Sequence, residues 1–249
     1  MCTLYLKEVE KQIEGFSQDG IKFAGLIFCS LFANEGLPDF PKDYLIKVSK
    51  LVRDSGGVLI LDEVQAGFGR TGTWWGYQLS NVSPDIAVMG KPMGSGLPVS
   101  GVIATEEISN TFHEKAFYFN TTAATPLQAA VAGTVIDIIQ DEGLIENAEK
   151  IGGYLKTELL KIKDDFGYLG DIRGPGLFIG LDIVDNKEDK NPDREKAIEI
   201  VEILKNKGVL ISNAGQYRNV LKLRPPLVFD LDNANLLLET LNQVFREVG

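Results

Sequence analysis

Two short stretches of the sequence carry side chains that could do chemistry. The first, LDEVQAGFGRTG at 61–72, places Asp62 and Glu63 at the end of an apolar run. Successive side chains of a strand point to opposite faces, so these two carboxylates should face opposite ways. The second, PDIAVMGKPMGSGLP at 84–98, carries Lys91 one glycine after an apolar run. Burial at a strand end would favour the neutral amine, which is a nucleophile.

The surroundings of these residues argue against an ordinary surface role. An acidic pair or a single lysine is usually a solvated charge. Here glycines recur around Arg70 and around Lys91, and glycine at such density indicates tight turns or close backbone approach. The lysine is not part of a nucleotide phosphate loop, because Pro92 follows it where Ser or Thr is required.

The elements that must position these residues alternate along the chain. Helical stretches follow short aliphatic runs, which predicts an α/β fold with a parallel-type sheet. We expect strands at 23–29, 58–63, 85–89, 99–104, 176–184 and 209–212, and helices at 4–16, 42–53, 126–166, 194–207 and 233–248. We place a domain boundary near residue 148, with most of the parallel sheet in residues 1–148 and a smaller α+β unit in residues 149–249.

Composition excludes several classes of function. No run approaches the ~18 apolar residues of a membrane span, and the first residues do not form a secretory signal, so we expect a cytoplasmic protein without a membrane partner. Two cysteines and one histidine cannot supply a structural zinc site, so no metal is expected. A net charge of −10 disfavours nucleic acid as a partner.

A carboxylate and a lysine at strand ends of one parallel sheet are what pyridoxal phosphate chemistry requires. With DEVQ followed by Gly-Lys, the sequence resembles the class III (omega) aminotransferases, of the aspartate-aminotransferase-like fold type I, over essentially its whole length. The resemblance implies a transaminase that moves an amino group between an amine or amino acid and a keto acid. It implies that Lys91 forms the internal aldimine with pyridoxal 5′-phosphate, that Asp62 pairs with the pyridinium nitrogen, that Val64 packs on the ring and that Gln65 reaches the ring hydroxyl.

The same resemblance implies a dimer. The family's Thr-Phe-Gly-Gly-Asn-Pro turn, whose threonine reaches the cofactor phosphate of the neighbouring subunit, reads TTAATP here. Thr121 is therefore the candidate for that contact, and a homodimer is expected. Alanines stand where the family has two glycines, which makes the turn less permissive.

Two further departures concern the substrate. Many members carry a glutamate where this chain has Asn34, and that glutamate pairs with a substrate-binding arginine whose place is taken by Lys222. Lysine offers a point charge rather than a planar fork, so bidentate carboxylate recognition is weakened. Lys222 and Arg224 either bind substrate or are strand-edge charges. The sequence here resembles the branch of alanine-glyoxylate aminotransferase 2-like proteins and phospholyases of phosphorylated amino alcohols, so phosphate elimination is the alternative reaction. Arg173 is expected to anchor the domain junction.

The family's phosphate-binding turn and ring-stacking aromatic residue are not recognisable before Asp62. We therefore expect a large domain that is incomplete at its N-terminus. Such a chain would pair with a copy of itself or with a chain that supplies the missing N-terminal segment. A truncated, non-catalytic partner subunit is the remaining alternative.

Overall fold

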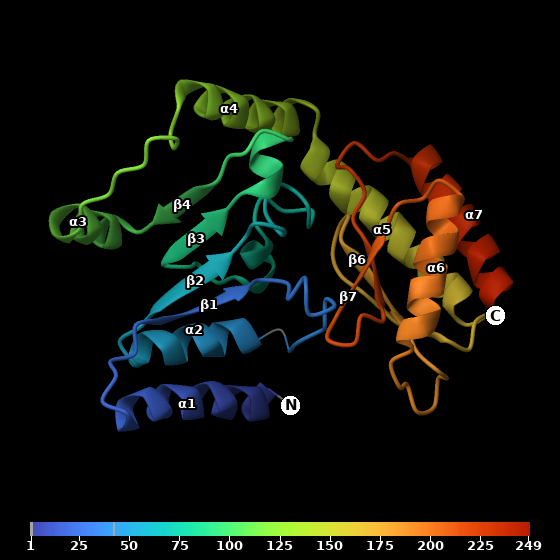
Figure 1. The fold of residues 1–249 in the computed structure, drawn as a ribbon, viewed down its shortest axis with the longest axis horizontal. Helices are drawn as coiled ribbons and strands as arrows, with labels where there is room; N and C mark the ends of the chain where they lie inside the picture. The colour runs from blue at the N-terminus through green and yellow to red at the C-terminus, as the bar shows by residue number, and fades with distance from the viewer. Residues whose placement is uncertain (1, 42) are drawn as a thin grey trace. The chain divides into compact units, whose positions relative to one another are not determined.

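The computed structural model describes residues 2–41 and 43–249, whose contacts form two compact units (Figure 1). Unit 1 comprises the residues up to Ser30 together with Phe40–Phe68 and Trp75–Ile139. Unit 2 comprises Leu31–Asp39, Gly69–Trp74 and Gln140–Gly249. Position 148, where the sequence suggests a boundary, lies inside a helix of unit 2, and unit 2 also takes in two short segments from earlier in the chain.

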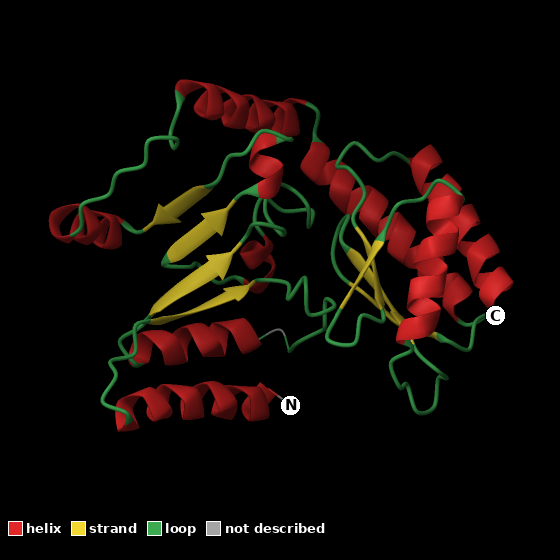
Figure 2. Ribbon diagram, in the orientation of Figure 1, coloured by secondary structure: helices red, strands yellow, loops and turns green. Residues whose placement is uncertain are grey.

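Unit 1 is built on a four-stranded sheet in the order β1-β2-β3-β4. Strands β1 (Gly25–Cys29), β2 (Val58–Asp62) and β3 (Ile86–Met89) are parallel, and β4 (Gly101–Ala104) runs antiparallel to β3. The α/β prediction is confirmed. The carboxyl ends of β1, β2 and β3 share one edge of the sheet, which Figure 2 shows as the edge of the arrowheads.

Among the helices of unit 1, α2 (Tyr44–Asp54) has a buried apolar face and is followed by a glycine. Helices α1 (Cys2–Gln18) and α2 run side by side, and α2 packs against β2 (Figure 2). Leu45 of α2 joins Leu59, Leu61 and Val82 in the core of this unit. Gly56, at φ +76°, lies just after α2, as the sequence predicts; the predicted start of this helix at position 42 lies outside the described residues. The other elements are α3 (Glu106–Lys115), α4 (Pro126–Asp141) and the short 3₁₀ turns η1 (Gly76–Ser80) and η2 (Lys91–Gly94).

Unit 2 is an antiparallel sheet covered by three helices. The strand order is β5-β6-β8-β7, from β5 (Leu169–Arg173), β6 (Ile179–Ile183), β7 (Ser212–Ala214) and β8 (Val220–Leu223). Helices α5 (Leu144–Lys163), α6 (Arg194–Asn206) and α7 (Leu231–Val248) pack on one face of the sheet (Figure 1). Their shared core is apolar, with Leu155, Leu181, Leu221 and Phe245 fully buried.

One predicted strand is misplaced. The run VLIS at 209–212 was expected to be extended, but β7 begins only at Ser212. Gly208 adopts φ +85°, and the Val209 N–H donates to the Leu204 carbonyl at 2.9 Å, so the first residue of this run completes the end of α6. Helix α3 and strand β5 were not predicted.

Within residues 2–41 and 43–249, no helix is both long enough and apolar enough to cross a membrane. Among the same residues, no group of three or more His, Cys, Asp or Glu side chains is arranged to hold a metal ion.

Candidate functional site

The structure brings Asp62 and Lys91 to the same edge of the unit 1 sheet. Asp62 is the last residue of β2, is half-buried, and pairs in register with Val88 of β3, three residues before Lys91. Its Oδ1 accepts the Val64 N–H at 2.9 Å, which turns the chain out of the strand. A carboxylate and an amine therefore follow two neighbouring parallel strands, where α/β proteins bind ligands.

Lys91 is exposed, so the expectation that it is buried is wrong. The reason is local: β3 ends at Met89, and Lys91 opens η2 with φ +36°, outside the packed strand. Positive φ is unfavourable for a residue with a side chain, and such strain clusters at functional sites. The preceding Gly90 lies beside Val64, because a Cβ on Gly90 would be 3.7 Å from Val64 Cγ1. Val64 is thus next to the residue that precedes Lys91.

Glu63, the neighbour of Asp62, has a structural role. Its side chain is fully buried and accepts the N–H groups of Gly76 at 2.7 Å and Tyr77 at 3.1 Å. These donors belong to the first turn of η1, so the carboxylate caps that turn. Burial raises the pKa of Glu63, and the two backbone hydrogen bonds oppose the increase. Only Asp62 of the acidic pair is therefore placed at the strand-end edge.

The glycine-rich stretch after the DEVQ box divides between the two units. In unit 1, Gln65 is half-buried and Gly67 lies against the Trp75 ring, which a Cβ on Gly67 would approach to 2.8 Å. In unit 2, Arg70 donates to the carbonyls of Leu177, at 3.3 Å, and Pro225. Burial, with Arg224 nearby, lowers the pKa of Arg70 to about 10. Close packing accounts for the glycine at 67, and Arg70 has a clear structural role.

Thr121 is exposed and lies on the 116–125 segment between α3 and α4, outside the strands of unit 1. The Asn120 side chain accepts the N–H of Thr122 at 3.0 Å and its hydroxyl at 3.1 Å. Ala124 adopts φ +56°, so an alanine occupies a conformation that favours glycine. The role of Thr121 at a neighbouring subunit stays a prediction.

In unit 2, Lys222 contacts Asn34, and these are the two positions that the resemblance pairs as arginine and glutamate in many family members. Lys222 belongs to β8, is 7% exposed, and donates to Asn34 Oδ1 at 3.3 Å. Its Nζ lies 5.4 Å from the centre of the Phe178 ring, a cation–π contact. Arg224 follows the strand and is exposed. Both Lys222 and Arg224 border an open groove of about 650 Å³, which includes Ser212.

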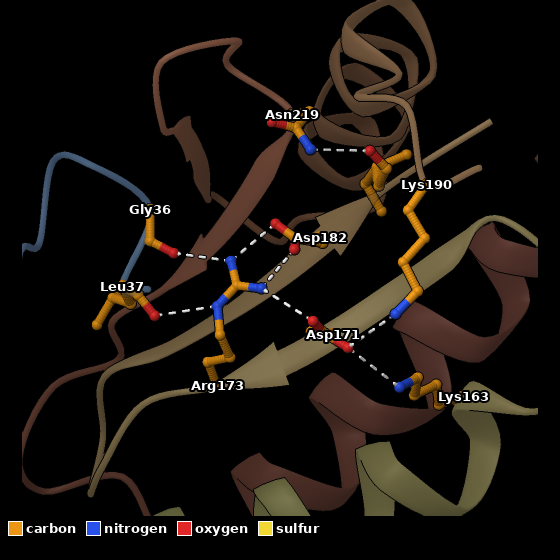
Figure 3. Close-up of polar contacts among 9 residues, drawn as sticks. Gly36, Leu37, Lys163, Asp171, Arg173, Asp182, Lys190 and Asn219 are labelled. Atoms are coloured by element: carbon orange, nitrogen blue, oxygen red, sulfur yellow. Dashed lines mark hydrogen bonds and ion pairs between the residues drawn. The ribbon is translucent and has the colours of Figure 1, made fainter. Parts of the chain in front are cut away.

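Arg173 of β5 holds the 31–39 segment onto the sheet (Figure 3). Its guanidinium binds both oxygens of Asp182 on the adjacent strand and donates to the carbonyls of Gly36 at 3.1 Å and Leu37 at 3.0 Å. The hydrogen-bonded Asp182 raises the pKa of Arg173. All of these groups belong to unit 2, so Arg173 anchors a segment within that unit, whereas the sequence suggested a domain junction.

Comparison with known proteins gives these positions a context. The class III aminotransferase family model matches residues 2–245. An alanine–glyoxylate aminotransferase 2-like protein of Drosophila melanogaster is 39% identical over 99% of this chain and 51% of its own length. A phospholyase from Arthrobacter, solved with phosphoethanolamine, is 38% identical over 98% of this chain and 58% of its own, with a TM-score of 0.96. An amine transaminase from an uncultivated Pseudomonas species, solved in its PLP-bound form, is 29% identical over the whole chain and 57% of its own, with a TM-score of 0.90. The chain spans about half the length of the curated relatives it matches.

Proposed function

The chain belongs to the class III aminotransferases, and we propose that it carries the lysine-bearing part of a pyridoxal phosphate-dependent transaminase. The reaction moves an amino group between an amine or amino acid and a keto acid. The observation that carries this proposal is the placement of Asp62 and Lys91 after neighbouring parallel strands, with Val64 beside Gly90. These residues fit the cofactor because an amine, a carboxylate and an apolar side chain come together at one sheet edge.

Pyridoxal phosphate, when bound, supplies an aldehyde that captures amines and a ring that takes up the electron pair of an adjacent carbon. Lys91 Nζ provides the attachment point and moves the proton to and from the reacting carbon. The Asp62 carboxylate would hold a proton on the ring nitrogen. Val64 would supply an apolar surface for the ring, and Gln65 would donate a hydrogen bond to the ring hydroxyl.

Covalent trapping on Lys91 tests the proposal. The purified chain is mixed with pyridoxal phosphate, and its absorbance is recorded before and after borohydride reduction. We expect a visible band that borohydride removes and a reduced adduct on the peptide containing Lys91. Lys91→Ala should abolish both signals, whereas Lys50→Ala, at an exposed position of α2, should leave them unchanged. A band of equal strength in the Lys91→Ala variant would refute the role of this lysine.

Phosphate elimination from a phosphorylated amino alcohol is the second candidate. It is favoured by Lys222, which offers a compact positive charge in place of a planar carboxylate-binding fork. The match to a phospholyase solved with phosphoethanolamine supports it further. The two reactions have different products, so holoenzyme incubated with phosphoethanolamine decides between them. Release of inorganic phosphate without amino transfer to an added keto acid favours elimination, and transfer without phosphate release favours transamination.

The exposed 116–125 segment supports a homodimer. Phe117, Tyr118 and Phe119 are 95%, 66% and 73% exposed, and Thr121 follows them. Burying three aromatic rings favours association with another chain. We expect sedimentation to give a dimer, and Phe117→Ser with Phe119→Ser to give a monomer. A chain that stays monomeric alone but pairs with a complete homologue, without binding the cofactor itself, would favour the non-catalytic partner subunit.

A further inference from the structure

The 31–39 segment is a tightly folded turn in an unfavourable backbone conformation. The N–H groups of Glu35 and Leu37 both donate to the Phe32 carbonyl, at 3.2 Å and 3.1 Å. Phe32 and Leu37 adopt φ values of +50° and +52°, which side chains disfavour. Such a conformation persists only where the surroundings enforce it.

Two features hold the segment against the unit 2 sheet. The first is the Arg173 guanidinium, fixed by Asp182, which binds the Gly36 and Leu37 carbonyls together (Figure 3). The planar guanidinium group suits this arrangement, because it presents several donors in fixed directions. The second is close packing: a Cβ on Gly36 would lie 2.9 Å from the Val220 side chain, and Leu37 is 3% exposed.

The turn places Asn34 against Lys222. The Asn34 carbonyl accepts the Gly215 N–H at 3.0 Å, which fixes its backbone. Its side-chain oxygen accepts the Lys222 ammonium at 3.3 Å, and the Phe178 ring lies 5.4 Å from the same nitrogen. A lysine side chain has four rotatable bonds, so a buried ammonium held on two sides is ordered in a way that an exposed lysine is not.

We propose that Asn34 and Arg173 are positioning residues for Lys222. Arg173, with Asp182, holds the 31–39 segment in place, and Asn34 then orients the Lys222 ammonium to receive the anionic end of the substrate. The anion suited to a single compact charge is a phosphate group, because a carboxylate is recognised better by a bidentate fork. The ordering of Lys222 rests on the contacts above and not on the proposed function; the receipt of a substrate anion does rest on the proposed function.

Lysine reactivity measures this ordering without any enzymatic turnover. The native chain is pulsed with an acetylating ester, and the acetylation rate of each lysine is read by peptide mass spectrometry. Asn34→Ala should raise the rate at Lys222 by about tenfold, the factor for losing one hydrogen bond of an ionised donor. Arg173→Lys should raise it to a similar extent, because an ammonium cannot replace the fork. The double variant should show no further increase, since both changes act through one contact.

Two controls separate positioning from general loosening. Arg53 binds Asp85 and the Ser83 carbonyl in unit 1, so Arg53→Lys is a matched change elsewhere and should leave Lys222 unaffected. Lys161, whose side chain is 64% exposed in unit 2, serves as the internal reference. If Arg173→Lys unfolds unit 2, the comparison rests on Asn34→Ala. An unchanged rate at Lys222 in Asn34→Ala would overturn the proposal, as would additive effects in a folded double variant.

Inorganic phosphate tests the receipt of an anion. Phosphate should slow acetylation of Lys222 relative to Lys161, and about tenfold more phosphate should be needed in Asn34→Ala. Lack of protection in the wild-type chain, or equal protection in the variant, would overturn this step. Because neither measurement needs the cofactor, a chain that failed to bind pyridoxal phosphate would refute the proposed function and leave the ordering of Lys222 intact.

Discussion

Removing the buried Glu63 carboxylate should destabilise unit 1 by a predictable amount. Glu63 is fully buried and accepts two backbone N–H groups of η1. In Glu63→Ala both donors lose their partner, at about 1–3 kcal/mol each. Relief of the buried charge offsets part of that loss, so we expect the free energy of unfolding to fall by about 2–4 kcal/mol. Glu63→Gln keeps one acceptor oxygen and should cost about half as much.

The assay is urea unfolding followed by the fluorescence of Trp75, which precedes η1, in a Trp74→Phe background. Glu10→Ala, at an exposed position of α1, should change the free energy of unfolding by no more than about 0.5 kcal/mol. A loss in Glu63→Ala as small as in this control would refute the capping role. So would a Glu63→Gln variant that is no more stable than Glu63→Ala.

The same carboxyl gives a signed pH dependence. Burial raises the pKa of Glu63 in the folded state above its unfolded value of about 4.3. The folded state then binds this proton more tightly, so the contribution of Glu63 is complete below the unfolded pKa and is lost as pH rises through the folded pKa. Gln cannot titrate there. The stability advantage of wild type over Glu63→Gln should therefore shrink as pH rises through that window, and an advantage that grew would contradict the assignment.

Three further predictions concern packing and turns, each read by urea unfolding. Ala124→Gly should raise the free energy of unfolding by about 0.5–1 kcal/mol, because Ala124 adopts φ +56°; no gain would show that the turn is unstrained. Gly152→Ala should destabilise unit 2 by about 2–3 kcal/mol, because the new Cβ would lie 2.1 Å from the Gly176 carbonyl oxygen. The adjacent Gly153→Ala meets no atom within 4 Å and should gain up to about 1 kcal/mol, so equal effects would refute the packing argument. Asn147→Ala should cost about 1–3 kcal/mol, because its amide donates to the carbonyls at positions 227 and 229, at 2.7 Å and 3.0 Å; a neutral result would exclude a role for that link.

The sequence predicted those parts of the fold that local pattern determines. Short apolar runs predicted β1, β2 and β3, and their parallel pairing places Asp62 and Lys91 at one edge. Helix α3 was missed because only Ile108 and Phe112 of its ten residues are apolar, too few to show a helical period. Strand β5 was missed because its pairing with β6 is irregular between Leu169 and Ile172, which breaks a simple alternation.

Prediction of the site failed at one local backbone conformation and at contacts between residues distant in the sequence. Burial of Lys91 was inferred from the strand before it, but its own φ of +36° takes it out of that strand. Arg173 binds carbonyls 136 and 137 positions earlier in the chain, and no periodicity encodes such a contact. The sequence does show that residue 173 is an arginine, the side chain best suited to bind a carboxylate and two carbonyls at once.

The two departures at positions 34 and 222 are best understood as one change. Taken separately, Asn34 lacks a negative charge and Lys222 lacks a planar fork. In the structure they touch, 188 positions apart in sequence. A neutral amide oxygen is one acceptor atom, which an ammonium satisfies through one of its three donors, whereas a guanidinium carries five donors, more than that oxygen can accept. A lysine–asparagine pair also has a net positive charge, whereas a glutamate–arginine pair is neutral overall. The pair therefore differs from a glutamate–arginine pair in both shape and charge, and this difference is the physical basis of the proposed preference for a compact anion.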